Sequence, residues 1–336
     1  MSPVGLSVVI PNRDGSELLR ECIQSLQTQS MRDLEAIVVD NASSDGSVDL
    51  VREHYPSVDL ITFKSNAGFA AATNAGIARA KGDYIAVLNN DAVPHRDWAA
   101  SLVDYMCSNE AVGFCASRVV FYMTPSLVDS CGDYYAREGV AGKIGHLAPA
   151  DRFEQPEEVF GAAASAAIYR RELLEEVGGF DEDFYLVHED TDLSFRARLM
   201  GYTCHFVPSA IVRHHVSRTI GYRSPLAEYY ASRNQEFVFL KDMPGALLLR
   251  YLAFHVLANG LQFAAHATRG RAGAWLRGKR DAMRFVPELI RKRRLVQRAA
   301  RASPDAIDRI LTRGWFVDAI RRLNAGRRAA PLECDR

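Results

Sequence analysis

The 336-residue sequence lacks the short motifs by which many nucleotide- and metal-binding proteins are identified. It has no G-x-G-x-x-G dinucleotide fingerprint and no G-x-x-x-x-G-K-[ST] phosphate loop, so a nucleotide would have to be held in another way. Its six cysteines are scattered, with no C-x-x-C pair and no metal-ligand spacing, which indicates buried thiols in a reducing compartment. The first residues contain neither a basic segment nor a long apolar run, so no signal peptide is expected.

The formal net charge of the protein is zero, but the charged residues are unevenly distributed along the sequence. The chain has 41 Lys and Arg and 41 Asp and Glu, and residues 241–336 hold 21 of the basic and 8 of the acidic side chains. A basic tail behind an acidic main part suits an anionic surface, either a membrane or a nucleic acid. We therefore expect a main domain over residues 1–240 and a basic amphipathic helical region over residues 241–336.

The tail also lacks an uninterrupted transmembrane run. The segment "ALLLRYLAFHVLANGLQFAAHA" (246–267) contains Arg250, His255, Asn259 and Gln262, whereas a spanning helix needs roughly 20 mostly uncharged residues. We favour a helix lying in the bilayer interface, and the alternative is a helical cap that packs on the main domain. Basic residues follow the segment: Arg269, Arg271, Arg277, Lys279, Arg280 and the stretch "IRKRRLVQRAAR".

Strands and helices alternate along the first ninety residues. Helical spacing in "SELLRECIQSLQTQ", "SVDLVREHY" and "GFAAATNAGIARAKG" separates four apolar runs, which predicts an α/β protein with a mostly parallel, doubly wound sheet and flanking helices. Residues 101–160 are expected to be largely irregular apart from a strand in "AVGFCASRVVFY". The predicted strands of the first part cover residues 6–10, 34–40, 58–64 and 84–91.

Polar side chains follow the predicted strands, at Asn12, Asp40, Asn66 and Asp91. Because ligands bind beyond the carboxyl ends of the strands in such sheets, these side chains predict a site. A carboxylate such as Asp91 suits Mg²⁺ or Mn²⁺, which complete their shell with diphosphate oxygens, although an Asx turn before Pro94 is the competing interpretation. His214 and His215 end a further predicted strand and could add a metal ligand or contact the diphosphate.

The stretch "YLVHEDTDLSFRARLMGY" places three carboxylates, Glu189, Asp190 and Asp192, just ahead of an amphipathic run. Helix capping needs only one or two of them. A sugar hydroxyl is a weak acid and needs a general base to remove its proton as it displaces a metal-bound diphosphate leaving group. We therefore expect one carboxylate to cap the helix, one to contact the substrate and one to take the proton.

Five landmarks occur in order over residues 6 to about 217, roughly two thirds of the chain. They are "SVVIPNRDG", "VVDNASSDGS", "SNAGFAAATNAGIARAKGDYIAVLNND", "GAAASAAIYRRELLEEVGGFDEDFYLVHEDTDLSFRARLMGY" and "SAIVRHHVS". With these landmarks the sequence resembles a family 2 glycosyltransferase with a GT-A fold, close to the bacterial rhamnosyltransferase-type members. The resemblance implies an inverting transfer, dependent on Mg²⁺ or Mn²⁺, of a sugar from a nucleoside diphosphate donor to a hydroxyl of a saccharide or lipid-linked saccharide.

The resemblance also implies roles for individual residues. Asp190 is the expected catalytic base and Glu189 contacts the acceptor. Asp91 and His214 are the expected metal ligands, with His215 as the alternative register. The expected nucleotide-binding residues are Pro11, Asn12, Asp40, Asn66, Asn74 and Asn90. The expected acceptor-binding residues, from the segment "EYYASRN", are Tyr230, Arg233 and Asn234.

Two departures from the family pattern limit the expected activity. Asn89 stands where the D-x-D motif has its first acid, which leaves fewer metal carboxylates. The Q-x-x-R-W signature of processive synthases is absent, so the enzyme is expected to add one sugar or a few. Rhamnose from dTDP-rhamnose is the expected donor sugar by resemblance alone, in cell-surface polysaccharide synthesis on the cytoplasmic face of the membrane.

Two other functions are compatible with parts of the sequence. A sugar nucleotidyltransferase would have a Gly-rich basic loop after the first strand, and "PNRDGSELL" is a poor match. A non-catalytic module that binds a membrane or nucleic acid would have no need of Asp190. We therefore expect a nucleoside diphosphate sugar, an acceptor and an anionic membrane surface as partners, and no nucleic acid.

Overall fold

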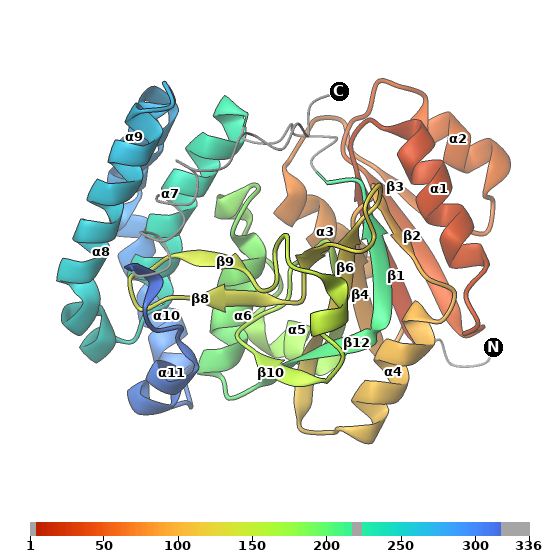
Figure 1. Ribbon diagram of the computed structural model, residues 1–336. Coiled ribbons are helices and arrows are strands. Elements are labelled where there is room, and N and C mark those ends of the chain that lie inside the picture. The colour runs from red at the N-terminus through yellow and green to blue at the C-terminus, as the bar shows by residue number, and fades with distance from the viewer. Residues whose placement is uncertain (1–4, 217–223, 317–336) are drawn as a thin grey trace.

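The computed structural model describes residues 5–216 and 224–316. A ten-stranded mixed sheet runs through the centre of the main domain, and helices cover both of its faces (Figure 1). Its strands lie in the order β10-β12-β6-β11-β4-β1-β2-β3, with β5 paired to β12 and β7 to β6. A separate two-stranded ribbon, β8-β9, lies between the sheet and the C-terminal helices (Figure 1).

The first part of the sheet is parallel, as the alternating pattern predicts. Strands β1, β2, β3 and β4 pair side by side in parallel, and helices α1, α2 and α3 connect them. The strand bounds are Leu6–Asn12, Leu34–Asp40, Asp59–Thr62 and Tyr84–Leu88. The helix bounds are Ser16–Gln27, Ser47–His54 and Phe69–Arg79.

Alternate side chains of β1 enter different cores because successive residues of a strand point to opposite faces. Val8 and Ile10 pack with the α1, α2 and α4 layer, whereas Val9 packs with the α3, α5 and α6 layer. Helix α3 approaches closely at Gly76, where an added Cβ would lie 2.3 Å from Val9 Cγ1. A glycine is therefore required at this contact.

The second part of the sheet reverses direction at β11, which pairs antiparallel with both β4 and β6, while β6 and β12 pair in parallel. The prediction of a largely irregular 101–160 region was only partly right, because it also contains most of α4 and several three-residue strands too short to show a period. The bounds are β5 Ala92–Pro94, α4 Trp98–Ser108, β6 Val112–Phe121, β7 Val128–Ser130, β8 Asp133–Tyr135, β9 Ala141–Lys143, η1 Ala150–Arg152, β10 Glu157–Val159, β11 Ala166–Arg170 and β12 Thr203–His214.

The expectation that one of the three clustered acids caps the following helix was wrong. Helix α6 (Glu189–Leu199) follows α5 (Arg171–Val177) and the short turn η2 (Glu182–Phe184), and its N-cap is His188, which makes no side-chain cap hydrogen bond. Asp192 is fully buried and forms ion pairs with Arg196 and Lys241. The third carboxylate therefore ties α6 to the C-terminal helices.

The C-terminal helices form a layer beside the sheet (Figure 1). A third apolar core joins them to α6, the 3₁₀ turn η2 and the β8-β9 ribbon. The predicted border between residues 240 and 241 falls inside α7. Five cysteines lie in the described residues, and Cys107 is exposed whereas the other four are buried as expected. The helix bounds are α7 Pro225–Asp242, α8 Gly245–Ala267, α9 Ala272–Arg284, α10 Val286–Ala299 and α11 Pro304–Ile310.

Candidate active site

Three predicted nucleotide-binding residues form one hydrogen-bonded row at the carboxyl ends of β1, β2 and β4. Asn12 Nδ2 donates to Asp40 Oδ2 at 3.0 Å, and Asn90 Nδ2 donates to Asn12 Oδ1 at 2.7 Å. The backbone N–H of Ser43 holds the other Asp40 oxygen at 2.9 Å. Parallel pairing of Asn12 with Asp40, one residue after Pro11, sets this row in place. The three side chains are thus fixed at the edge where a ligand would bind.

Asn66 and Asn74, which are also predicted to bind the nucleotide, lie in different surroundings. Asn66 Oδ1 accepts hydrogen bonds from Asn41 Nδ2 at 2.9 Å and from the Gly68 N–H at 3.0 Å, just beyond β2 and β3. Asn74 instead braces α3 against the segment before η2, since its amide both donates to and accepts from the Phe180 backbone, at 2.8 and 2.9 Å. The structure therefore brings Asn66 to the strand ends and commits the Asn74 amide to the backbone of Phe180.

A carboxylate–imidazole–carboxylate chain lies beside the row. His214 Nε2 is 3.0 Å from Asp91 Oδ1, and His214 Nδ1 is 3.0 Å from Asp129 Oδ2. All three side chains are buried. His215 points elsewhere, because its Nε2 lies 3.1 Å from Glu21 Oε2 and its ring stacks on Tyr122. Of the two adjacent histidines, the structure places His214 against Asp91.

The charged forms of His214, Asp91 and Asp129 stabilise one another. Burial alone would lower the pKa of His214, but its hydrogen bonds to Asp129 and Asp91 raise that pKa to about 9. Burial likewise opposes ionisation of the two carboxyl groups, and hydrogen bonding outweighs it. The pKa of Asp91 is lowered by His214, and the pKa of Asp129 is lowered by His146, His214 and Lys143. Hydrogen bonding among these three buried side chains thus favours their charged forms.

The donor atoms of Asp91 and His214 fit a hard divalent cation. A carboxylate oxygen of Asp91 and a ring nitrogen of His214 converge within 3.0 Å of each other, and the Asn89 amide nitrogen lies 3.5 Å from the same ring nitrogen. Mg²⁺ and Mn²⁺ sites in nucleotide enzymes commonly use one or two protein carboxylates together with phosphate oxygens. Among residues 5–216 and 224–316 there is no complete cluster of three or more His, Cys, Asp or Glu ligands. The site would therefore need a phosphate-bearing ligand to complete a cation shell.

The acidic start of α6 is connected to the Asp91–His214 pair through hydrogen bonds to one short backbone segment. Asp190 Oδ2 accepts the Ala164 N–H at 3.1 Å, and the next carbonyl, of Ser165, accepts the Asn89 N–H at 3.0 Å. Asn89 is two residues before Asp91. The structure thus brings the predicted base and the predicted metal ligand to neighbouring segments.

Two further carboxyl groups surround Asp190. Glu189 is buried, and its Oε2 has no hydrogen-bond partner within the described residues. Burial, and then the charge of Asp190, raise the pKa of Glu189 well above its usual range, and the same two causes do so for Asp133 of β8. A carboxyl group that stays protonated can donate a hydrogen bond to a bound ligand.

Two of the predicted acceptor-binding side chains hold the loop that precedes these acids. Asn234 Nδ2 donates to the carbonyls of Phe184, Leu186 and Val187, and Arg233 donates to those of Asp183 and Phe184. Both side chains are buried. The loop needs such support because Tyr185, Val187 and His188 all have positive φ, which costs of order 1 kcal/mol or more for residues other than glycine.

The third predicted acceptor-binding residue, Tyr230, belongs to α7 and packs against the same loop. Its ring stacks on Tyr185 with 5.1 Å between the ring centroids, and the Arg233 guanidinium lies 4.7 Å from its centroid. Both tyrosines are partly exposed. The pair therefore offers an aromatic surface four residues before Glu189.

Sequence reasoning missed Asp129 and Asp133. Both belong to three-residue strands inside the region expected to be irregular. The only sequence signal was an acid within the otherwise apolar "SLVDSC", and it identifies no partner. Their placement depends on the pairing of β7 with β6 and of β8 with β9, and strands this short show no period from which that pairing could be read.

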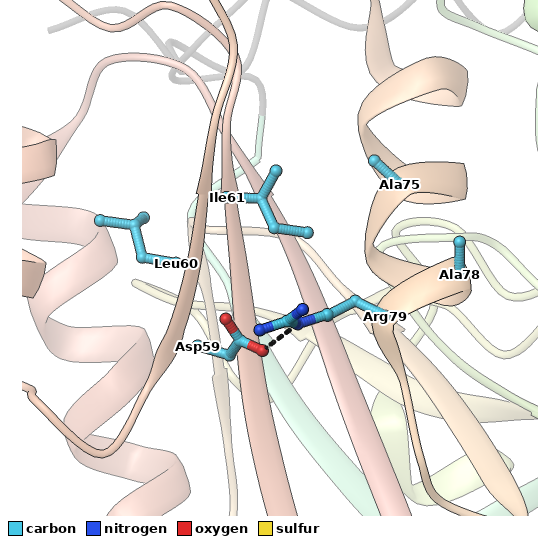
Figure 2. Close-up of a pocket in the computed structure, with 6 residues that line it drawn as sticks. All are labelled: Asp59, Leu60, Ile61, Ala75, Ala78 and Arg79. Atoms are coloured by element: carbon cyan, nitrogen blue, oxygen red, sulfur yellow. Dashed lines mark hydrogen bonds and ion pairs between the residues drawn. The ribbon is translucent and has the colours of Figure 1, made fainter.

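A shallow surface hollow of about 420 Å³ lies away from these residues, between the edge strand β3 and α3 (Figure 2). Arg79 Nε lies 2.6 Å from Asp59 Oδ2 at its floor, and Ala75 and Ala78 form one wall. Asp59 is at the amino end of β3, opposite to the carboxyl ends where the candidate site lies. The charged side chains of the hollow, Asp59 and Arg79, are already paired with each other, so we assign the hollow no function.

The chain was compared with known proteins. The glycosyl transferase family 2 model matches residues 7–178. An N-acetylglucosaminyl-diphospho-decaprenol L-rhamnosyltransferase of Mycobacterium tuberculosis is 27% identical over 256 residues, which cover 67% of this chain and 80% of that protein. A pre-mycofactocin glycosyltransferase of the same organism is 32% identical over 62% of this chain and 42% of its own length.

Solved structures share the fold of this protein. A mannosyltransferase of Pyrobaculum calidifontis, solved with GDP-mannose and Mn²⁺, superposes with a TM-score of 0.53 at 19% identity, over 88% of this chain and 85% of its own. GalNAc-T7, solved with UDP, GalNAc and Mn²⁺, gives a TM-score of 0.56 at 17% identity, over 69% of this chain and 47% of its own. The fold is of the GT-A type, as the resemblance predicts. The chain belongs to glycosyl transferase family 2 and is a glycosyltransferase.

Proposed function

We propose that this glycosyltransferase moves a sugar from a nucleoside diphosphate donor to a hydroxyl of a saccharide or lipid-linked saccharide, with inversion at the anomeric carbon. The observation that supports this best is the short link between two groups of side chains. Asp190 and the Asp91–His214 pair lie on segments joined through Ala164, Ser165 and Asn89. A base beside a diphosphate-binding centre is what such a displacement requires.

The donor would lie across the strand ends. Asp40, Asn12 and Asn90 would contact the nucleoside, with Pro11 and Asn66 beside them and the diphosphate toward Asp91. Asp91 and His214 would hold Mg²⁺ or Mn²⁺, which supplies charge neutralisation for the departing diphosphate. Two solved structures of similar fold contain Mn²⁺, which supports a divalent cation here.

The acceptor would enter beside α6. Its hydroxyl would transfer a proton to Asp190 as its oxygen attacks the anomeric carbon from the face opposite the diphosphate. Glu189, whose buried Oε2 has no partner among the described residues, would hydrogen-bond the same acceptor. Arg233 and Asn234 would act through the loop that they hold, and Tyr230 with Tyr185 would face the acceptor sugar.

The relatives suggest the class of substrate. The M. tuberculosis relative is named as a rhamnosyltransferase that acts on a decaprenol-linked N-acetylglucosamine diphosphate, and an Erwinia amylovora relative, 26% identical, is named for amylovoran biosynthesis. We propose by analogy dTDP-rhamnose as the donor, a lipid-linked saccharide as the acceptor, and polysaccharide synthesis on the cytoplasmic face of the membrane as the setting.

A thermal-shift experiment tests the donor site. The purified protein is melted with UDP-, dTDP- and GDP-sugars, each with Mn²⁺ and with EDTA, because a ligand of the native state raises the melting temperature by mass action. A rise of several degrees that one nucleotide gives only with Mn²⁺ supports the proposal and identifies the nucleoside. If no nucleotide raises the melting temperature in either buffer, the proposed donor site is wrong.

A further inference from the structure

Helix α8 exposes a continuous apolar stripe. Its six large exposed apolar side chains are 38–75% exposed. Within residues 5–216 and 224–316, α8 alone is long and apolar enough to cross a membrane by length and composition, and 22% of its most apolar window is buried. The stripe consists of Leu249, Leu252, Phe254, Val256, Leu257 and Phe263.

The opposite face of α8 points into the protein, and it carries polar side chains beside the buried Leu247 and Ala258. Tyr251 Oη donates to Asp308 Oδ1 at 2.6 Å. His255 Nε2 lies 3.0 Å from Glu236 Oε2, and Asn259 Nδ2 donates to Glu236 Oε1 at 2.9 Å. A surface helix of a soluble protein normally has its apolar face inside and its polar face outside. Helix α8 departs from this arrangement, because large apolar side chains lie outside while polar ones are held inside.

These inward contacts determine how α8 could meet a lipid bilayer. A helix that crossed the bilayer alone would take Tyr251, His255 and Asn259 away from Asp308 and Glu236 and into hydrocarbon, which is costly for polar groups. In the structure they keep one side of α8 fastened to α7 and α11. Only the outer stripe is free, which is the geometry of a helix lying in the plane of the interface.

Positive charge accompanies the stripe. Arg250 on α8, Arg269 at its end and Arg277 on the neighbouring helix α9 are exposed, and none of them pairs with an acidic side chain in the described residues. Leu276, beside Arg277, is a further exposed apolar residue. Helices α8 and α9 form the edge of the molecule farthest from β3 and α2 (Figure 1). A second copy of the chain on this face would bring arginines against arginines, whereas anionic headgroups complement them.

We propose that the outer face of α8, with Leu276 and the three arginines, docks on an anionic lipid surface with the helix axis in the membrane plane. This docking surface is defined by residues outside the candidate active site, so it does not depend on the proposed sugar transfer. It would hold the enzyme beside membrane-bound molecules without a spanning helix.

Flotation with lipid vesicles tests this proposal on the full chain. One vesicle type contains phosphatidylcholine only, and the other contains phosphatidylcholine with one third phosphatidylglycerol. The double variant Leu252→Asp/Val256→Asp removes the stripe, and Arg250→Glu/Arg277→Glu reverses the charge. Leu147→Asp is the matched control, because Leu147 is 55% exposed on a loop away from α8. Thermal unfolding of each variant verifies that it is folded.

The wild type and Leu147→Asp should float with the anionic vesicles and much less with the neutral ones. Each double variant should lower vesicle affinity at least tenfold while keeping the wild-type melting temperature. Equal binding by the wild type and Leu252→Asp/Val256→Asp would overturn the proposal. So would a wild type that ignores vesicles and is dimeric by light scattering, with the aspartate variant monomeric, because a second copy would then cover the stripe.

Discussion

Asp129 Oδ2 lies 3.0 Å from His214 Nδ1, on the side of the imidazole opposite to Asp91. When Nδ1 donates to this carboxylate, the neutral ring presents its lone pair at Nε2, which faces Asp91. Asp129 is itself held by Lys143 Nζ, 2.8 Å from each of its oxygens. The buried carboxylate therefore sets the orientation of the imidazole of the proposed metal ligand.

We expect Asp129→Asn to weaken Mn²⁺ binding by about 10–100-fold, the usual cost of losing a carboxylate that orients a metal-bound histidine. The affinity of the protein for Mn²⁺ with nucleoside diphosphate present, measured by calorimetry or electron paramagnetic resonance, checks this. His215→Ala is the control and should retain the wild-type affinity, because His215 faces Glu21 and Tyr122. If His215→Ala lost Mn²⁺ and His214→Ala kept it, the metal ligand would be the other histidine.

We expect Asp190→Asn to lower kcat by about 10²–10⁴-fold, because the amide cannot accept the acceptor proton. The donor should bind with unchanged affinity, which calorimetry measures separately from turnover. Asp192→Asn is the neighbouring control: it breaks the buried pairs with Arg196 and Lys241 and should lower the melting temperature, while turnover per folded molecule persists. Near-normal turnover by Asp190→Asn would sink its role as the base.

The part of the site that follows from local sequence could be predicted. Asn12, Asp40 and Asp91 come directly after apolar runs, and parallel pairing alone brings the ends of such runs together. Asp129 and Asp133 could not be found in this way, because strands of three residues show no period from which their faces or partners could be inferred. Asp192 was misjudged because one of its partners, Lys241, lies 49 residues further along the chain.

Asn234 is predicted to act as a positioning residue. Its amide holds three loop carbonyls, so Asn234→Ala should lower the free energy of unfolding by about 1–3 kcal/mol and let Glu189 and Asp190 shift. We expect kcat to fall about tenfold or more with little change in the KM for the donor. Gln235→Ala is the control, because the Gln235 side chain reaches Asn259 of α8 and leaves the loop intact. Equal kcat in the two variants would mean that Asn234 only stabilises the fold.

The cluster around Glu236 predicts how the C-terminal layer responds to acid. Burial would raise the pKa of Glu236, but hydrogen bonding from His255 and the charge of Lys279 lower it to about 2. A lowered folded-state pKa gives stability that is fully present above the unfolded value, ~4.3, and is lost as the pH falls toward 2. The wild type should therefore lose stability on the order of 3 kcal/mol over this range through this group.

Urea unfolding of the wild type and Glu236→Gln from pH 6 to pH 2.5 measures this loss. The wild type should be the more stable at pH 6, and the difference should shrink steadily below pH 4.3, because a protonated Glu236 resembles glutamine. Glu288→Gln changes an exposed acid that forms a solvent-exposed ion pair with Arg291, so its difference from the wild type should stay small at every pH. A Glu236→Gln difference that is constant from pH 6 to pH 2.5 would show that the charge of Glu236 contributes nothing to holding α8 and α9 on α7.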